Sequence, residues 1–229
     1  SKMPDYIKLC IETIKNKNKN FTIKIINDND FKKISSIYHP EFENITPLGM
    51  RSDYISFCIL TEFGGIYLDC DTICVKNLTK YFNLLKQYEF VGFEHDKIKG
   101  NISVGIMISR PNGVIVKRTL DEMHYYLNNK SEKSIPWGYF SDSLRDFIKE
   151  SNDENIYKGF DAKETVYPTH WKISKSYWWS NGSINDNLLN MDMVCLHNNM
   201  YNDEIRNYSK SHILSGDYRI SKIFREILN

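Results

Sequence analysis

The sequence has no run of about eighteen apolar residues, no excess of charge of one sign and no Cys-x-x-Cys pair. The first absence excludes a membrane-spanning helix from this segment, because such a helix needs about 20 apolar residues. There are 30 basic and 29 acidic residues. Because nucleic acids select strongly basic surfaces, this balance gives no reason to expect a nucleic-acid partner.

Cysteine is scarce and irregularly spaced, with five residues in 229. The spacing matches neither a zinc site nor a regular disulfide framework. Several of these cysteines lie in apolar stretches, so we expect buried free thiols in a reducing compartment and a cytoplasmic location. They are Cys10, Cys58, Cys70, Cys74 and Cys195.

The most informative stretch runs from Met50 to Val75 and combines a helix pattern, a glycine pair and a short apolar strand pattern. Apolar residues recur at spacings of three or four as far as Phe63, which predicts a buried helix. Gly64-Gly65 predicts the end of that helix, because glycine adopts the left-handed conformation that follows a last turn. Ile66–Leu68 is β-branched and aromatic, which predicts a strand entering the core.

Two aspartates, Asp69 and Asp71, follow this strand directly, and apolar residues resume at Ile73. In an extended chain, residues two apart lie on the same side. Carboxylate oxygens are the ligands that Mg²⁺ and Mn²⁺ prefer in proteins. An isolated Asp-x-Asp is more often a solvated turn, but charges beside buried strands need a cation or hydrogen-bond donors. The context therefore predicts a site for Mn²⁺ or Mg²⁺ at the strand end.

The segment RSDYISFCILTEFGGIYLDCDT resembles the sugar-nucleotide-binding region of DXD-type glycosyltransferases with the GT-A fold. Capsular-polysaccharide synthesis proteins and initiating mannosyltransferases share the pattern R-x-D, an apolar helix, and G-G-[IV]-Y-x-D-x-D. Many members carry a second arginine at the position of Ser56, so this chain departs from the family there. The matching residues are Arg51, Asp53, Gly64, Gly65, Tyr67, Asp69 and Asp71.

Helix and strand patterns alternate before and through this segment, which predicts an α/β fold with a mostly parallel central sheet flanked by helices. The resemblance implies a GT-A-like, Rossmann-like single domain over residues 1–229, with a nucleotide-sugar half at about 1–110 and an acceptor half at about 111–229. Further predicted segments are a helix at Met3–Lys17, a strand at Phe21–Ile26, a polar loop at Asn129–Ser134, an irregular aromatic stretch at Tyr157–Gly182, a strand at Met191–Leu196 and helices at Val114–Asn128, Trp137–Ile148 and Ser215–Leu228.

The resemblance also implies an activity and roles for individual residues. It implies a metal-dependent hexosyltransferase of glycan or polysaccharide biosynthesis that moves a sugar from a nucleotide-sugar donor to a glycan or other hydroxyl acceptor with retention. UDP-sugars are the commonest donors in such families. Asp71 would bind the metal, Asp69 the ribose, the sugar or a metal-bound water, and Asp53 the donor-sugar hydroxyls. Arg51 and Tyr67 would complete the donor site, and Asp53, Asp69 and Asp71 are the candidate catalytic residues.

Two further sets of residues are candidates by position. His197 directly follows the last predicted strand, where related transferases place a histidine near the metal, so it is a candidate third ligand with Asp69 and Asp71. A lone histidine is otherwise more often a packing residue. Trp137, Tyr139 and Asp142 lie in a segment that resembles the acceptor side of the family; a core helix with a solvated aspartate is an equal alternative.

Two other functions remain open from the sequence. Ser56 in place of the second arginine motivates a catalytically degenerate module that binds nucleotide-sugar or glycan without turnover. A phosphohydrolase whose first aspartate is a nucleophile is the weaker alternative. Such enzymes have a downstream Gly-Asp followed by a further acid, and Gly216-Asp217 lacks that acid.

Overall fold

The computed structural model describes residues 3–96, 100–129 and 134–229, which fold into two compact units built from separated stretches of chain. The terminal unit comprises Ser1–Ile23, Asp69–Thr79 and Ala162–Asn229, and the central unit comprises Lys24–Leu68 and Lys80–Asp161. The prediction of a single domain over the whole chain stays a prediction. Most of the polar loop predicted at 129–134 lies outside the described residues.

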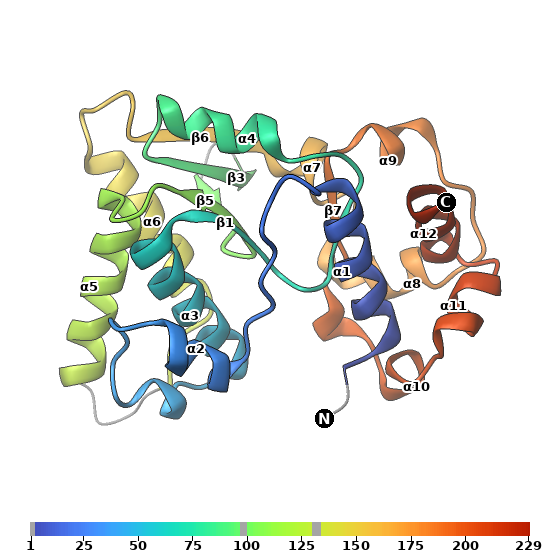
Figure 1. Ribbon diagram of the computed structural model, residues 1–229, viewed down its shortest axis with the longest axis horizontal. Helices are drawn as coiled ribbons and strands as arrows, with labels where there is room; N and C mark the ends of the chain where they lie inside the picture. Colours follow the sequence, from blue (N-terminus) through green and yellow to red (C-terminus); the bar gives the residue numbers. More distant parts are fainter. Residues whose placement is uncertain (1–2, 97–99, 130–133) are drawn as a thin grey trace. The chain divides into compact units, whose positions relative to one another are not determined.

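The central unit contains a five-stranded sheet in the order β1-β5-β3-β4, with β6 paired to β3 (Figure 1). The β1–β5, β3–β5 and β3–β4 pairs are antiparallel, and β3–β6 is parallel. The strands are β1 (Gly65–Leu68), β3 (Phe90–Asp96), β4 (Asn101–Ile102), β5 (Ile106–Ser109) and β6 (Tyr157–Asp161).

The mixed α/β class is confirmed, whereas the prediction of a mostly parallel sheet is wrong. Strands β3, β4 and β5 follow one another through short connections, and short connections join antiparallel strands. The parallel pair β3–β6 is joined through two long helices, as a parallel crossover requires. The predicted strand at Phe21–Ile26 is also wrong, because among the described residues no strand pairs with it.

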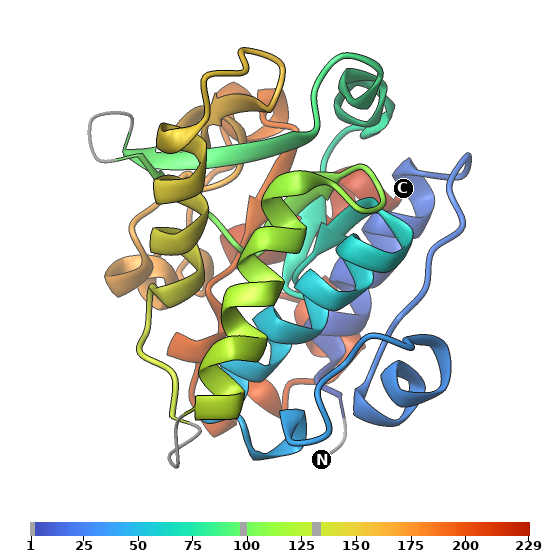
Figure 2. The same cartoon turned by 90° about the vertical axis from the view of Figure 1, so that its left-hand side faces the viewer.

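Three helices pack together in the central unit: α3 (Leu48–Phe63), α5 (Val114–Asn129) and α6 (Tyr139–Glu150). Figure 2 shows α3 and α5 side by side. Phe57 of α3 stacks on Phe140 of α6 with ring centroids 4.9 Å apart, and both rings are fully buried. The α3 face that the helical spacing predicts is buried through Cys58, whereas Phe63 at the end of the helix is 53% exposed.

The end of α3 confirms the glycine prediction. Gly64 has φ +63° and Gly65 has φ +101°, both in the left-handed region that favours glycine. A Cβ atom added to Gly64 would lie 2.5 Å from the backbone nitrogen of Pro111. The Asn112 N–H donates to the Thr61 carbonyl at 2.7 Å, so the turn after β5 fixes the last turn of α3.

The terminal unit is built around a two-stranded antiparallel ladder of β2 (Thr72–Cys74) and β7 (Met193–Cys195). Helix α1 (Asp5–Lys17) packs on β2, and α12 (Arg219–Leu228) packs on α1. The core includes Trp178, which is fully buried. Helices α1, α5 and α12 and strand β7 confirm predicted elements to within a few residues.

The irregular stretch predicted at Tyr157–Gly182 instead begins with β6 and contains short helices. Within the described part of the chain, no helix is both long and apolar enough to cross a membrane. All five cysteines are free, and four of them are buried, the exception being Cys70. The remaining helical segments are α2 (Asp28–Ile34), α4 (Thr79–Asn83), α7 (Ala162–Thr165), α8 (Ser174–Trp178), α9 (Asp186–Asn190), α10 (Asp203–Arg206), α11 (Lys210–Ser215) and the 3₁₀ turns at Phe42–Asn44, Leu84–Lys86, Trp171–Ile173 and Asn198–Met200.

Candidate nucleotide-sugar and metal site

The Asp-x-Asp motif forms a tight turn between β1 and β2. The Thr72 N–H donates to the Asp69 carbonyl at 3.0 Å, so the chain turns at Cys70 and Asp71. The prediction of an extended chain through the motif is therefore wrong, and the period-two argument for a shared side does not apply. The two carboxylates have different surroundings: Asp69 is half-buried, whereas Asp71 is 6% exposed.

Asp71 is held by the residues that follow β7. The β2–β7 ladder pairs Thr72 with Cys195, and beyond it the Leu196 N–H donates to the Asp71 carbonyl at 3.1 Å. The Asn198 N–H donates to Asp71 Oδ2 at 2.7 Å, and Cys195 Sγ lies 3.8 Å from Oδ1. Burial raises the pKa of Asp71, and the hydrogen bond from Asn198 partly opposes that rise. The carboxylate is thus an oxygen donor in a setting that favours a bound cation.

His197 lies between these two contacts and has a backbone conformation that is uncommon for a residue with a side chain. Its φ is +51°, in the left-handed region. This turn lets Leu196 and Asn198 both donate to Asp71, one to its carbonyl and the other to its carboxylate. The His197 ring stacks on Tyr167, with centroids 5.0 Å apart and planes at 22°.

Among the described residues, no three His, Cys, Asp or Glu side chains are grouped as ligands of one metal ion. The structure therefore brings the backbone around His197 to Asp71 but gives no three-ligand set for Asp71, Asp69 and His197. Mg²⁺ and Mn²⁺ sites with one or two carboxylates, completed by substrate phosphates, do not need three protein ligands. The donor chemistry at Asp71 fits such an ion.

Asn198 has a larger part in this arrangement than the sequence indicated. Its side-chain Oδ1 accepts from the Tyr6 hydroxyl at 3.0 Å, and its carbonyl accepts from Arg206 Nη2 at 2.9 Å. One contact holds the side chain of Asn198 and the other its backbone, and the N–H of the same residue holds Asp71. In the sequence, the role of Asn198 is indicated only by its position in the His197-Asn198-Asn199 run after a predicted strand. Nothing in the sequence links Tyr6 or Arg206 to that run.

Arg51 and Asp53 both lie on α3 in the central unit, but Arg51 is ion-paired whereas Asp53 is buried. Arg51 Nη1 pairs with Asp28 Oδ2 at 3.1 Å, and its Nε and Nη2 atoms donate to the Ile45 carbonyl, each at 3.4 Å. These contacts tie α3 to the segment before it, so Arg51 has structural partners in addition to its predicted donor role. The Tyr67 hydroxyl on β1 lies 3.3 Å from Ser52 Oγ on α3.

Asp53 is buried, and the described residues provide no compensating partner for its carboxylate. It is 7% exposed, and burial raises its pKa to about 7. Among the described residues, no hydrogen-bond donor contacts its carboxylate. Ser56, at the family's second arginine position, donates its hydroxyl to the Asp53 carbonyl at 2.6 Å and not to the carboxylate. Asp53 is therefore a buried acceptor group available to a ligand with hydroxyl donors.

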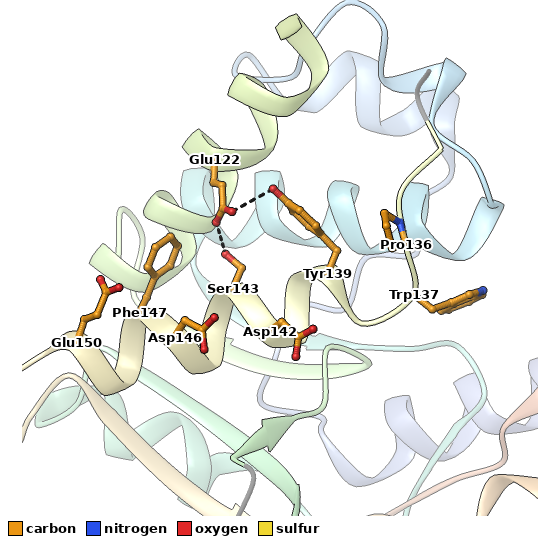
Figure 3. Close-up of a pocket in the computed structure, with 9 residues that line it drawn as sticks. All are labelled: Glu122, Pro136, Trp137, Tyr139, Asp142, Ser143, Asp146, Phe147 and Glu150. Carbon is orange, nitrogen blue, oxygen red and sulfur yellow. Dashed lines mark hydrogen bonds between the residues drawn. The ribbon is translucent and has the colours of Figure 1, made fainter. Parts of the chain in front are cut away.

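The predicted acceptor residues Trp137, Tyr139 and Asp142 all line one pocket of about 400 Å³ in the central unit (Figure 3). The Tyr139 hydroxyl donates to Glu122 at 3.2 Å, and the Ser143 hydroxyl donates to the other oxygen of Glu122 at 2.5 Å. The remaining lining residues are Pro136, Asp146, Phe147 and Glu150.

Asp142 of this pocket is ion-paired with Arg145 at 2.6 Å. Sequence reasoning missed the carboxylate of Glu122, which lies on α5, since only the packing of α5 on α6 brings it to Tyr139. The spacing of Asp142, Asp146 and Glu150 along α6 places the three acidic groups on one helical face, a signal that the sequence did contain.

Comparisons with known proteins match the region of the motif. Residues 4–98 match the family described as "Glycosyltransferase sugar-binding region containing DXD motif". An uncharacterized glycosyltransferase, L373, of Acanthamoeba polyphaga mimivirus is 30% identical over 115 residues, which cover 49% of this chain and 45% of the relative's own length. The solved structure of PaToxG glycosyltransferase aligns over 98% of this chain and 80% of its own with 14% identity and a TM-score of 0.42, a value too low to establish a shared fold. Residues 4–98 are thus similar to the sugar-binding region of DXD-type glycosyltransferases, which confirms the resemblance predicted from the sequence.

Proposed function

We propose that the chain is a GT-A-like glycosyltransferase that transfers a sugar from a nucleotide-sugar donor, with UDP-sugars favoured, to a glycan or other hydroxyl acceptor with retention. The observation that carries the proposal is Asp71, a buried carboxylate of the DXD motif held by the Asn198 N–H. The match of residues 4–98 to the DXD-containing family supports the same activity.

Asp71 would hold Mn²⁺ or Mg²⁺, with Asp69 and His197 as further ligands or as ligands of its bound water. Such an ion, when bound, stabilises the negative charge that grows on a diphosphate leaving group. The Asn198 N–H keeps one oxygen of Asp71 fixed, so the carboxylate needs little reorganisation to bind.

In the central unit, Asp53 would accept hydrogen bonds from donor-sugar hydroxyls. A ligand hydroxyl supplies the donor that this buried carboxylate lacks among the described residues. Arg51 would keep α3 in place through Asp28, and Tyr67 would line the donor site. Trp137, Tyr139 and Asp142 would contribute to acceptor binding from the wall of their pocket.

The second candidate function is a module that binds nucleotide-sugar or glycan without turnover. One observation favours it: Ser56 replaces the second arginine and bonds to the helix backbone, so it supplies no cation to the donor. The two functions differ in one readout, because only the transferase releases UDP or GDP from a sugar donor.

A thermal-shift screen with UDP, GDP and their common sugars, with and without Mn²⁺, tests the proposal. A ligand at a hundred times its dissociation constant stabilises the folded protein by about 2.7 kcal/mol. We expect a Mn²⁺-dependent shift that is lost in Asp71→Asn, which keeps an oxygen that can accept from Asn198. Asp192→Asn is the matched control, because Asp192 lies in the same unit with 5% exposure and has no assigned role.

Nucleotide release from the same sugars then separates the two functions. Release that depends on Mn²⁺ and is lost in Asp71→Asn supports the transferase, whereas a shift without release supports the binding module. A wild-type protein that no nucleotide or nucleotide-sugar stabilises would contradict the transferase and the nucleotide-sugar-binding module, and would leave only a module that binds glycan.

A further inference from the structure

Trp137 is set apart from the other residues of its pocket. Its side chain is among the most exposed large apolar groups of the described chain, at 69%. In Figure 3 it extends away from Asp142 and Asp146, whereas the Tyr139 hydroxyl bonds to Glu122. An indole with this exposure is a free aromatic surface, and such surfaces are typical of binding sites for flat or ring-shaped ligands.

The exposed indole nevertheless packs against the first turn of α3. A Cβ atom added to Gly49 would lie 2.7 Å from Trp137 Cη2, 3.3 Å from Cζ3 and 3.5 Å from Cζ2, so only glycine admits the ring this closely. The backbone leading to Trp137 is fixed to the same place, because the Ile135 N–H donates to the Thr46 carbonyl at 2.8 Å.

Asp53 lies one helical turn after Gly49 and on the same side of α3, since residues four apart share a helix face. It is the buried carboxylate without a donor among the described residues. An exposed aromatic face and an acceptor that no described residue pairs with thus lie about one turn apart within the central unit. A sugar ring carries the two matching surfaces: C–H groups on its face and hydroxyl donors at its edge.

We propose that Trp137 and Asp53 form a subsite for one sugar ring, in which the indole of Trp137 packs on the ring face and Gly49 fixes the indole in place. The inference rests on the proposed function, and it adds Trp137 to the sugar-binding role proposed for Asp53. The ring is either the sugar of the nucleotide donor or a sugar of the glycan acceptor. The chemistry of recognition is the same for both.

Three full-length variants test the subsite. Trp137→Ala removes the aromatic surface and Trp137→Phe keeps part of it. Gly49→Ala keeps the indole but forces it to move, because its Cβ would approach the ring to 2.7 Å. Alanine is also a better helix former than glycine by up to about 1 kcal/mol, so this variant is expected to fold even if Trp137→Ala does not.

The first readout needs no turnover. Stabilisation by a UDP-sugar minus that by UDP alone, both with Mn²⁺, isolates the contribution of the sugar. The second readout is kinetic: the KM for the donor in hydrolysis without acceptor, and the KM for a panel of short oligosaccharides in transfer. We expect Trp137→Ala and Gly49→Ala to weaken sugar binding about tenfold, with a smaller loss in Trp137→Phe and with binding of UDP unchanged.

The two sources of the sugar give different results. A loss in the sugar-dependent stabilisation and a raised donor KM assign the donor's sugar to the subsite. A raised oligosaccharide KM with an unchanged donor KM assigns the acceptor's sugar. If Gly49→Ala and Trp137→Ala leave both KM values and the sugar-dependent stabilisation within twofold of wild type, the subsite is refuted. The proposed function then still stands on the Mn²⁺-dependent response to UDP, whose absence from the wild type would refute that function instead.

Discussion

The buried carboxylate of Asp53 leads to a prediction about stability that is opposite to the usual effect of a mutation in a binding site. Burial raises its pKa to about 7 from an unperturbed 3.8. In the folded protein the ionised form is therefore disfavoured. We expect Asp53→Asn to stabilise the chain at neutral and alkaline pH while it weakens binding of the sugar.

The direction with pH follows from proton linkage. Between the unfolded pKa and the folded pKa, the native state binds more protons than the unfolded state, so stability falls as pH rises through that window. A difference of about three pKa units corresponds to about 4 kcal/mol when the group is fully ionised. The part of this loss that develops from pH 5 to pH 8 is about 2.5 kcal/mol.

Urea unfolding of wild type and Asp53→Asn at several pH values between 5 and 8 measures the effect. The difference in unfolding free energy between the two proteins should grow by about 2.5 kcal/mol across this range, in favour of Asn. Taking the difference cancels the contributions of other titrating groups, including Asp71. Asp121→Asn is the control, because its side chain is exposed on α5 and should shift stability by less than about 0.5 kcal/mol.

Parallel pH profiles for wild type and Asp53→Asn would refute this reasoning, because they would mean that the Asp53 carboxylate is hydrated or paired in the folded protein. The same pair of proteins also tests the ligand role. A UDP-sugar should stabilise wild type more than UDP does, and this extra stabilisation should be lost in Asp53→Asn.

Three further predictions concern the two units. Gly64→Ala places a Cβ atom 2.5 Å from the Pro111 nitrogen at φ +63°, so it should destabilise by about 1–3 kcal/mol in thermal unfolding, and an unchanged midpoint would contradict the packing at the end of α3. Phe57→Ala removes a fully buried ring and should cost about 3–5 kcal/mol in urea; a cost below 1 kcal/mol would mean that the ring is not in the core. Tyr6→Phe removes the hydroxyl that bonds to Asn198 and should cost about 1 kcal/mol and weaken Mn²⁺-dependent nucleotide binding; full retention of that binding would show that the bond does not support Asp71.

Features set by neighbouring residues were predictable from the sequence. The helix that ends at Phe63 and its glycine end follow from apolar spacing and from the special conformations of Gly64 and Gly65, which need no distant partner. The DXD motif and its family resemblance were equally local. The conformation of the motif was not: its turn is hydrogen-bonded between Asp69 and Thr72, and apolar flanks do not distinguish a turn from an extended chain.

Features set by pairing across the chain were not predictable. β6 is half-buried throughout and has mixed polarity, so only its parallel pairing with β3 makes it a strand. Phe21–Ile26 has a strand composition but no partner strand among the described residues. The hydrogen bond from Asn198 to Asp71 joins residues 127 apart in sequence, and only the β2–β7 ladder brings them together.

The order of the two units along the sequence has a consequence during synthesis. The central unit is complete once Asp161 has left the ribosome, while the terminal unit still lacks Ala162–Asn229. Asn198 follows Asp71 by 127 residues, so at typical rates of about 5–20 residues per second the turn that carries Asp69 and Asp71 leaves the ribosome about 6–25 s before Asn198 does. During that interval Asp71 is without the backbone N–H that holds it in the finished protein. A nascent chain arrested when Asp161 has just left the ribosome should therefore contain a protease-resistant central unit and a still exposed motif.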